Sequence, residues 1–182
     1  GPHAKYYTEE LMKEPWDFIV KGDGERVLPR IINGDIPKTH KLIIDKLSKK
    51  ELNEMPRPDR LNNISYLKQY NYTLINKEST TILTARGCCE SCTFCEAAKT
   101  EIQRTPIEKI KLELDDIVQL GYKGIYIFDD IFALAPKITE PICKEIQKRD
   151  LIYRCNGQAR MMNEQFMKML KETGCVEIAF GA

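Results

Sequence analysis

The feature that most constrains the fold is a regular alternation of strand-like and helix-like segments between residues 80 and 180. Short apolar or β-branched runs predict strands at residues 80–85, 124–128, 151–155 and 176–180. Between them, apolar residues at helical spacing, with Thr105 and Asn163 as caps, predict helices at residues 105–121, 138–148 and 163–174. Strands joined by right-handed helical crossovers form a parallel sheet. We therefore predict an α/β fold.

Polar or reactive residues follow each of the predicted strands. In parallel α/β sheets the functional groups lie at the carboxyl ends of the strands, which meet at one edge. That rule predicts an edge that carries residues 88–95, Asp129 and Asp130, residues 158–160, and Gly181. This edge is the expected functional site.

The segment after the first of these strands contains three cysteines at a distinctive spacing. Cys88, Cys92 and Cys95 form CxxxCxxC, and Cys89 lies inside the run but off the spacing. Thiolates are the ligands that iron-sulfur clusters take, so three of them on one loop can hold three irons of a cubane. The fourth iron then has no protein ligand. An open coordination position is typical of a catalytic site rather than of a closed structural one.

Two simpler interpretations of the cysteines fit the sequence less well. A zinc site would need a second ligand pair, which the sequence does not offer. A disulfide framework does not suit seven cysteines, an odd number, without a recognisable secretory leader. The other thiols, Cys143, Cys155 and Cys175, lie within predicted elements and are expected to be small buried residues.

With Phe94 as its aromatic residue, the run resembles the CxxxCxΦC motif of the radical S-adenosylmethionine (SAM) superfamily. The resemblance implies a 4Fe-4S cluster held by Cys88, Cys92 and Cys95, with SAM on the open iron. It also implies cleavage of SAM to a 5'-deoxyadenosyl radical, with an electron donor such as flavodoxin or ferredoxin. The implied fold is a partial (β/α)6 TIM-like barrel, of which residues 80–182 are the first four β/α units.

The same resemblance implies roles for other residues of the edge. Asp129 and Asp130 stand where the family has residues that contact the SAM amino group, and a solvated loop or helix cap is the alternative. Arg160 has the fork geometry that suits the SAM carboxylate, and a surface salt bridge is its alternative. Gly181 ends the fourth strand, just before the place where the family has a ribose-binding Glu.

The first 35 residues resemble a second element of such enzymes. Gly1-Pro2-His3-Ala4, a helix, the run WDFIVKGDGE and another helix resemble the last third of the Rossmann-like cobalamin-binding domain that precedes many radical SAM barrels. The resemblance implies that Gly1 and His3 lie in a loop beside the nucleotide tail of cobalamin. Asp23 departs from the family's Glu, and no DxHxxG stretch for a cobalt ligand is present.

Residues 36–79 lack clean periodicity and are rich in Lys, Asn, Pro and Tyr, which predicts a linker. Within it, Tyr66, Tyr70 and Tyr72 are expected to pin the linker onto the next domain. The predicted organisation is therefore the end of a cobalamin-binding-like domain (residues 1–35), a linker (36–79) and a truncated barrel (80–182). We expect the chain to be an internal part of a longer enzyme.

Composition limits the partners. Lys and Arg number 28 against 27 Asp and Glu, so no basic field indicates nucleic acid. No apolar run reaches the ~20 residues that a membrane span needs, so no membrane partner is indicated. Free thiols and a labile cluster motif predict a cytoplasmic protein. The expected substrate is a small molecule or a peptide.

The sequence leaves three functions open. The first is cobalamin-dependent methyl transfer to an unactivated carbon or phosphorus by a radical SAM enzyme. The second is a radical SAM methylthiotransferase or cyclase that lacks cobalamin chemistry. The third is a non-catalytic iron-sulfur or electron-transfer protein, which the absence of a fourth cysteine at suitable spacing disfavours.

Overall fold

The computed structural model describes residues 1–62, 66 and 72–181 of the chain. It divides into two compact units, Gly1–Met55 (unit 1) and Pro56–Ala182 (unit 2), which we describe separately. No helix among the described residues has the length and apolar character needed to cross a membrane.

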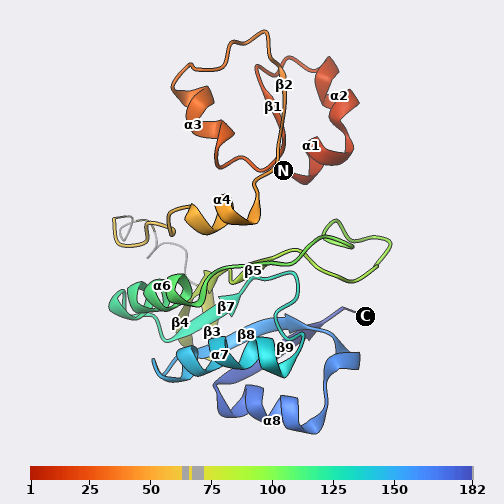
Figure 1. The fold of residues 1–182 in the computed structure, drawn as a ribbon. Coiled ribbons are helices and arrows are strands. Elements are labelled where there is room, and N and C mark those ends of the chain that lie inside the picture. The colour runs from red at the N-terminus through yellow and green to blue at the C-terminus, as the bar shows by residue number, and fades with distance from the viewer. Residues whose placement is uncertain (63–65, 67–71, 182) are drawn as a thin grey trace. The chain divides into compact units, whose positions relative to one another are not determined.

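Unit 1 is built around two short parallel strands. Its elements in chain order are α1 (Pro2–Tyr6), α2 (Thr8–Lys13), β1 (Ile19–Gly22), α3 (Val27–Ile32), β2 (Leu42–Asp45) and α4 (Lys49–Glu54) (Figure 1). β1 and β2 pair in parallel from Ile19↔Leu42 to Gly22↔Asp45. The Asp23 carboxylate accepts a hydrogen bond from the Leu47 backbone at 2.7 Å, and Arg26 pairs with both Asp45 and Glu51. These contacts join the turn after β1 to the segment after β2.

The amino-terminal loop expected at Gly1 to Ala4 is absent from unit 1 as described. Residues 2–6 form α1 instead, with His3 stacked on Tyr7 at 4.9 Å between ring centroids. Pro2 at the first helical turn favours this start, because its fixed φ suits a helix and its missing N–H needs no partner. Within the run WDFIVKGDGE, strand β1 begins at Ile19, whose N–H donates to the Lys41 carbonyl at 2.6 Å.

The predicted linker at residues 36–79 is not a linker throughout. β2 and α4 belong to unit 1, whereas β3 (Tyr72–Leu74) and β4 (Lys77–Ile82) form an antiparallel hairpin in unit 2. Strands of three or four residues are too short to show a hydrophobic period. Whether such a segment forms a strand therefore depends on its pairing with distant segments. The boundary between the units falls instead between Met55 and Pro56.

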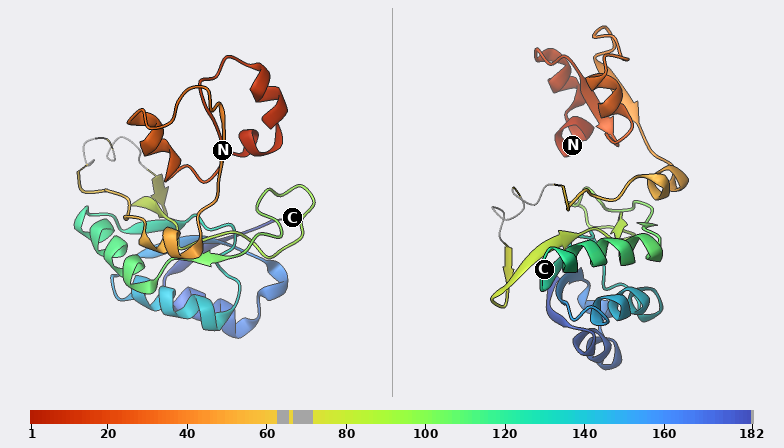
Figure 2. Two further views of the ribbon diagram at one scale, coloured as in Figure 1. Left: turned by 45° about the horizontal axis from the view of Figure 1, so that its top comes forward. Right: turned by 90° about the vertical axis from the view of Figure 1, so that its left-hand side faces the viewer.

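In the part of unit 2 that the structure describes, five strands form one sheet in the order β3-β4-β7-β8-β9. β4, β7 (Gly124–Ile127), β8 (Ile152–Gly157) and β9 (Cys175–Phe180) are parallel, and β3 runs antiparallel to β4. Helices α6 (Ile107–Gln119), α7 (Pro136–Gln147) and α8 (Glu164–Glu172) cover one face of the sheet (Figure 2, right). The α/β prediction is confirmed at this level, as a curled half-barrel of mainly parallel strands.

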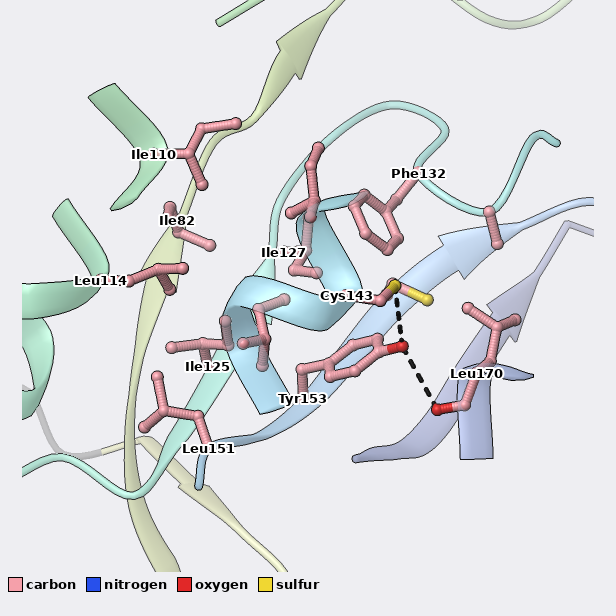
Figure 3. Close-up of a cluster of buried hydrophobic side chains, with 14 of the residues drawn as sticks. Ile82, Ile110, Leu114, Ile125, Ile127, Phe132, Cys143, Leu151, Tyr153 and Leu170 are labelled. Atoms are coloured by element: carbon pink, nitrogen blue, oxygen red, sulfur yellow. Dashed lines mark hydrogen bonds between the residues drawn. The ribbon is translucent and has the colours of Figure 1, made fainter. Parts of the chain in front are cut away.

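The core of unit 2 lies between these helices and the sheet (Figure 3). Alternate residues of the strands, such as Ile125 and Tyr153, meet apolar residues of the helices, such as Leu114. The Tyr153 hydroxyl lies within hydrogen-bond distance of the Cys143 sulfur (3.1 Å) and the Leu170 carbonyl (3.3 Å). Cys143 and Cys155 are buried as predicted, and Cys175 is partly buried.

Two helix starts illustrate a correct and an incorrect prediction. The Asn163 side chain caps α8 and accepts a hydrogen bond from the Phe166 backbone at 2.9 Å. Thr105 does not cap α6, which begins after Pro106 without a side-chain cap. The Thr105 N–H instead donates to the Thr84 carbonyl at 2.8 Å. Thr105 therefore extends the pairing between the segments before and after the loop that holds the motif cysteines, although the local pattern predicted that it would cap the helix.

Arginines, more than tyrosines, attach the start of unit 2 to its core. Arg60 is buried and pairs with Glu113 of α6 at 2.6 Å, and it also donates to the Thr80 hydroxyl at 3.1 Å. Arg57 pairs with Asp116 on the same helix. Of the predicted aromatic anchors, Tyr72 stacks on Tyr126 and Tyr66 is exposed, whereas Tyr70 lies outside the described residues.

Candidate site at the carboxyl edge of the sheet

The three cysteines of the motif lie on a closed loop, residues 87–100, which we call the cysteine loop. It follows β4 and the short strand β5 (Ala85–Arg86), which pairs antiparallel with β6 (Gln103–Arg104) beyond the loop. The Cys88 N–H donates to the Thr100 hydroxyl and the Thr100 N–H to the Cys88 carbonyl, both at 3.0 Å. The Lys99 N–H donates to the Glu90 carbonyl at 2.7 Å. Backbone bonds therefore continue the pairing of β5 and β6 into the base of the loop.

Gly87 starts the loop in a conformation that a side chain would obstruct. Its φ is +94°, and a Cβ built there would lie 2.3 Å from the Glu101 carbonyl oxygen. Its N–H donates to the Asp130 carboxylate at 2.8 Å. Asp130, in the segment that follows β7, thus holds the start of the cysteine loop.

The three motif cysteines differ in their surroundings. Cys88 is buried, whereas Cys92 and Cys95 are exposed and joined by a turn in which the Cys95 N–H donates to the Cys92 carbonyl at 3.2 Å. Burial is the main cause that raises the pKa of the Cys88 thiol. Cys89 and Phe94 are also exposed.

No group of three His, Cys, Asp or Glu side chains among the described residues is gathered closely enough to hold a metal ion. The donor set nonetheless suits a soft metal, because three thiols share one loop and two of them are exposed. The cluster ligands Cys88, Cys92 and Cys95 therefore stay a prediction, since the ligand geometry is not preformed in this structure.

Asp129 lies at the carboxyl edge but is buried there and not open to solvent. Its carboxylate accepts hydrogen bonds from the Thr84 backbone (2.6 Å) and the Thr84 hydroxyl, so it joins the ends of β4 and β7. Burial raises the pKa of Asp129 to about 6, against the opposing effect of these hydrogen bonds. Asp129 is 1% exposed, and its carboxylate already accepts hydrogen bonds from protein donors.

Arg160 lies in the short helix η1 (Ala159–Met161) that follows β8, and it contacts the cysteine loop. Its Nε–H donates to the Gln158 side-chain oxygen at 2.7 Å, and its Nη2 pairs with the Glu90 carboxylate. Hydrogen bonds from Arg160 and then Gln158 lower the pKa of Glu90. The surface salt bridge expected as the alternative for Arg160 is present, and its partner is a residue of the cysteine motif.

Asn156 on β8 is a member of this edge that sequence reasoning missed. Its side-chain amide donates to the Asp129 carbonyl at 2.9 Å and accepts from the Tyr126 hydroxyl at 3.3 Å. Its own carbonyl accepts from the Phe132 and Ala133 backbones. A polar residue near the carboxyl end of an otherwise apolar strand is the sequence signal that could have indicated it.

The face of the sheet away from the helices carries aromatic rings and the guanidinium of Arg154. Arg154 lies 4.7 Å from the Tyr126 ring centroid and donates to the Tyr72 hydroxyl at 3.1 Å. Its Nε lies 3.1 Å from the Glu177 carboxylate, in a direction that leaves this N–H without a satisfactory hydrogen bond. Phe128 packs edge-on against Tyr126 and is largely exposed.

The remaining predicted site residues are not joined to this group. Gly181 is exposed, with nothing within 4 Å of a Cβ built on it. Gly1 and His3 are exposed residues of unit 1. The carboxyl edge therefore brings together Cys88, Asp129, Asp130 and Arg160 through contacts with Thr84, Gly87 and Glu90.

Comparison with known proteins adds to this geometry. No protein-family model matches the chain. The anaerobic magnesium-protoporphyrin IX monomethyl ester cyclase of Rubrivivax gelatinosus is 22% identical over 206 aligned positions, which cover all of this chain and 37% of that protein. The chain thus spans little more than a third of the length of this curated relative.

Two solved structures of the radical SAM methyltransferase TsrM from Kitasatospora setae share the fold. One, with cobalamin and a [4Fe-4S] cluster bound, matches with a TM-score of 0.51 and 21% identity over 59% of this chain and 23% of that one. The other, with tryptophan and a SAM analogue bound, matches with a TM-score of 0.54 and 20% identity over 66% of this chain and 23% of that one. The chain is distantly similar to cobalamin-binding radical SAM proteins.

Proposed function

We propose that this chain is part of a radical SAM enzyme in which Cys88, Cys92 and Cys95 bind a 4Fe-4S cluster. The observation that carries the proposal is the position of the cysteine loop. It follows the first parallel strand, at the edge where β4, β7, β8 and β9 all end. In parallel α/β sheets this is the edge at which ligands bind.

The residues of the edge would orient the loop and the cosubstrate. Two of the contacts come from the segment after β7: Asp130 accepts a hydrogen bond from Gly87, and Asp129 accepts one from Thr84. A third comes from the end of the loop, where Thr100 accepts a hydrogen bond from Cys88. Together they fix the base of the loop. We assign Arg160 to the carboxylate of SAM, because a guanidinium binds a carboxylate through paired N–H groups. When bound, the cluster supplies the electron that cleaves SAM.

Unit 2 would be the first four β/α units of a partial barrel, and unit 1 the end of a Rossmann-like cobalamin-binding domain. Unit 1 supports this with a parallel strand pair and a tight turn at Gly22 and Asp23, the run that resembles such domains. The favoured reaction is cobalamin-dependent methyl transfer, with a reductant such as flavodoxin or ferredoxin. A cyclase is the second candidate, because the curated relative bears that name.

The cluster assignment is tested by anaerobic reconstitution of the intact protein with iron and sulfide. We expect about four irons and four sulfides per protein, the content of a cubane. Replacing Cys88, Cys92 or Cys95 singly by Ala should reduce the content strongly and abolish SAM cleavage. Cys89→Ala is the matched control in the same loop and should retain both. Equal loss in Cys89→Ala would overturn the assignment.

The cobalamin assignment is tested on the same preparation with cobalamin supplied. A corrin absorption spectrum that persists after desalting, and that weakens when His3 is replaced by Ala, would support the role of unit 1. Turnover that yields both S-adenosylhomocysteine and 5'-deoxyadenosine would favour methyl transfer. A protein that binds no corrin and yields 5'-deoxyadenosine and methionine alone would favour the second candidate.

A further inference from the structure

Arg160 already holds a carboxylate in this structure, and that carboxylate comes from within the cysteine motif. Glu90 lies between Cys88 and Cys92, and its side chain pairs with Arg160 Nη2. The Glu90 side chain is 14% exposed, whereas the Arg160 side chain is 64% exposed. The carboxylate is therefore largely covered, whereas the guanidinium is largely exposed to solvent.

The backbone of Glu90 is held independently of this ion pair. Its carbonyl accepts from the Lys99 N–H at 2.7 Å, and Cys88 two residues earlier is paired with Thr100. Glu90 is thus part of the base of the cysteine loop. Its side chain can leave Arg160 without the loop losing these backbone bonds.

The stereochemistry of the guanidinium limits where a second carboxylate can bind. A carboxylate binds an arginine in bidentate fashion either along the Nε–Nη2 edge or along the Nη1–Nη2 edge. The Nε–H of Arg160 donates to Gln158, so the first edge lacks a free pair of donors, and Glu90 takes one of the two N–H groups of Nη2. A second carboxylate can therefore bind in bidentate fashion only along the Nη1–Nη2 edge, where it shares Nη2 with Glu90.

We propose that Glu90 competes with the carboxylate of SAM for Arg160, so that binding of SAM displaces Glu90 from the guanidinium. The proposal rests on the assignment of Arg160 in the proposed function. Two carboxylates side by side on one guanidinium would also repel each other, which opposes simultaneous binding. Glu90 is a positioning residue here, since it acts through Arg160.

The competition predicts effects of opposite sign for two substitutions in one ion pair. Glu90→Gln weakens the hold on Arg160 and should tighten SAM binding by about two- to five-fold, the range that exposed ion pairs span. Arg160→Gln removes the fork and should weaken SAM binding by about ten-fold or more. A purely structural ion pair predicts the same sign for both. Asp115→Asn is the matched control, because it removes a carboxylate 2.7 Å from Arg149 on the helix-covered side.

The experiment is equilibrium dialysis of SAM against the intact, anaerobically reconstituted protein, with iron content measured for every variant. Decarboxylated SAM serves as the second probe, because it lacks the group that competes with Glu90. We expect Glu90→Gln to tighten binding of SAM and to leave binding of decarboxylated SAM unchanged. Glu90→Ala should also tighten binding of SAM. Because Ala cannot bond to Arg160, this variant shows whether a residual hydrogen bond from the Gln amide masks the effect in Glu90→Gln.

The outcomes separate this inference from the proposed function. If the wild-type protein takes up no cluster or binds no SAM, the proposed function fails. If it binds SAM but Glu90→Gln binds it equally or more weakly at equal iron content, the competition is wrong and the proposed function stands. If Glu90→Gln tightens binding of SAM and of decarboxylated SAM equally, the effect does not depend on the SAM carboxylate, and the competition is again wrong.

Discussion

The helix-covered face of the unit 2 sheet and its carboxyl edge are made by the same strands, yet different forces hold them. On the covered face, Ile125 and Ile127 of β7 are fully buried among apolar side chains. Two residues later, Asp129 is almost as buried but is held by hydrogen bonds to Thr84. Asp130 then reaches the start of the cysteine loop. Apolar burial secures the sheet, and polar contacts arrange the loop on it.

This contrast indicates how the two regions should respond to substitution. Removing apolar volume from the covered face affects the whole cooperative unit, because packing there is dense and cavities are costly. Removing a polar contact at the edge affects mainly the loop that it holds, because local segments can open separately from the core. Four predictions test this difference, beginning with the largest effect.

Leu114→Ala should lower the free energy of unfolding by about 3 to 5 kcal/mol, because this side chain has no exposed surface and its loss leaves a cavity. Leu112→Ala on the same helix is the matched control and should cost below about 1 kcal/mol, because Leu112 is 51% exposed. Urea denaturation of the intact protein measures both. Similar losses for the two variants would mean that α6 does not cover the sheet as described.

Asp129→Asn should remove a pH dependence of stability. The pKa of Asp129 in the folded protein is about 6, above its usual 3.8, so the folded protein binds this proton more tightly than the unfolded chain. The stability that protonation contributes is therefore full below about pH 4 and is lost as the pH rises through about 6. The change amounts to at most about 3 kcal/mol.

The measurement is the difference in unfolding free energy between the wild-type protein and Asp129→Asn at several pH values from about 4 to about 7. Other titrating groups contribute to both proteins and cancel in this difference. A difference that does not vary with pH would show that Asp129 titrates normally, and that the edge is more solvated than its burial indicates.

Tyr153→Phe should cost about 1 kcal/mol, the net contribution of an ordinary buried hydrogen bond. The loss is limited because Thr173, 3.0 Å from the Tyr153 hydroxyl, also bonds to the Met169 carbonyl at 2.8 Å. Tyr66→Phe, at an exposed tyrosine, is the control and should be neutral. A loss of several kcal/mol would indicate that polar contacts matter in the covered face as much as packing.

Asp130→Ala should have the smallest effect on global stability, below about 0.5 kcal/mol, because its contact with Gly87 is exposed. Locally, exchange of the Gly87 amide hydrogen should accelerate about five- to ten-fold, since its acceptor is lost. The Lys99 amide, which donates to the Glu90 carbonyl, is the internal control. Global destabilisation together with unchanged Gly87 exchange would contradict the division between face and edge.

The parallel α/β pattern of residues 107–180 can be predicted from the sequence alone, because each signal there is local. Apolar residues at helical spacing mark α6, α7 and α8, and Asn163 caps α8 as predicted. The position of the three motif cysteines after a strand also follows from the pattern alone. Where the signals were weak, as in β2 and β3, the prediction failed, since the period of a very short strand cannot be recognised.

Which edge residues meet depends on the tertiary structure and cannot be predicted from local sequence. Glu90 and Arg160 are 70 positions apart in the chain, and Thr84 and Asp129 are 45 apart. Nothing local in the sequence pairs them, because the order of strands in the sheet brings the ends of β4, β7 and β8 together. At Thr105 a contact between segments prevails over a local signal, since its hydrogen bond to Thr84 replaces the helix cap that the local pattern predicted. Local sequence specifies an element through its own backbone and side chains, whereas contacts between elements depend on how the whole sheet closes over its core.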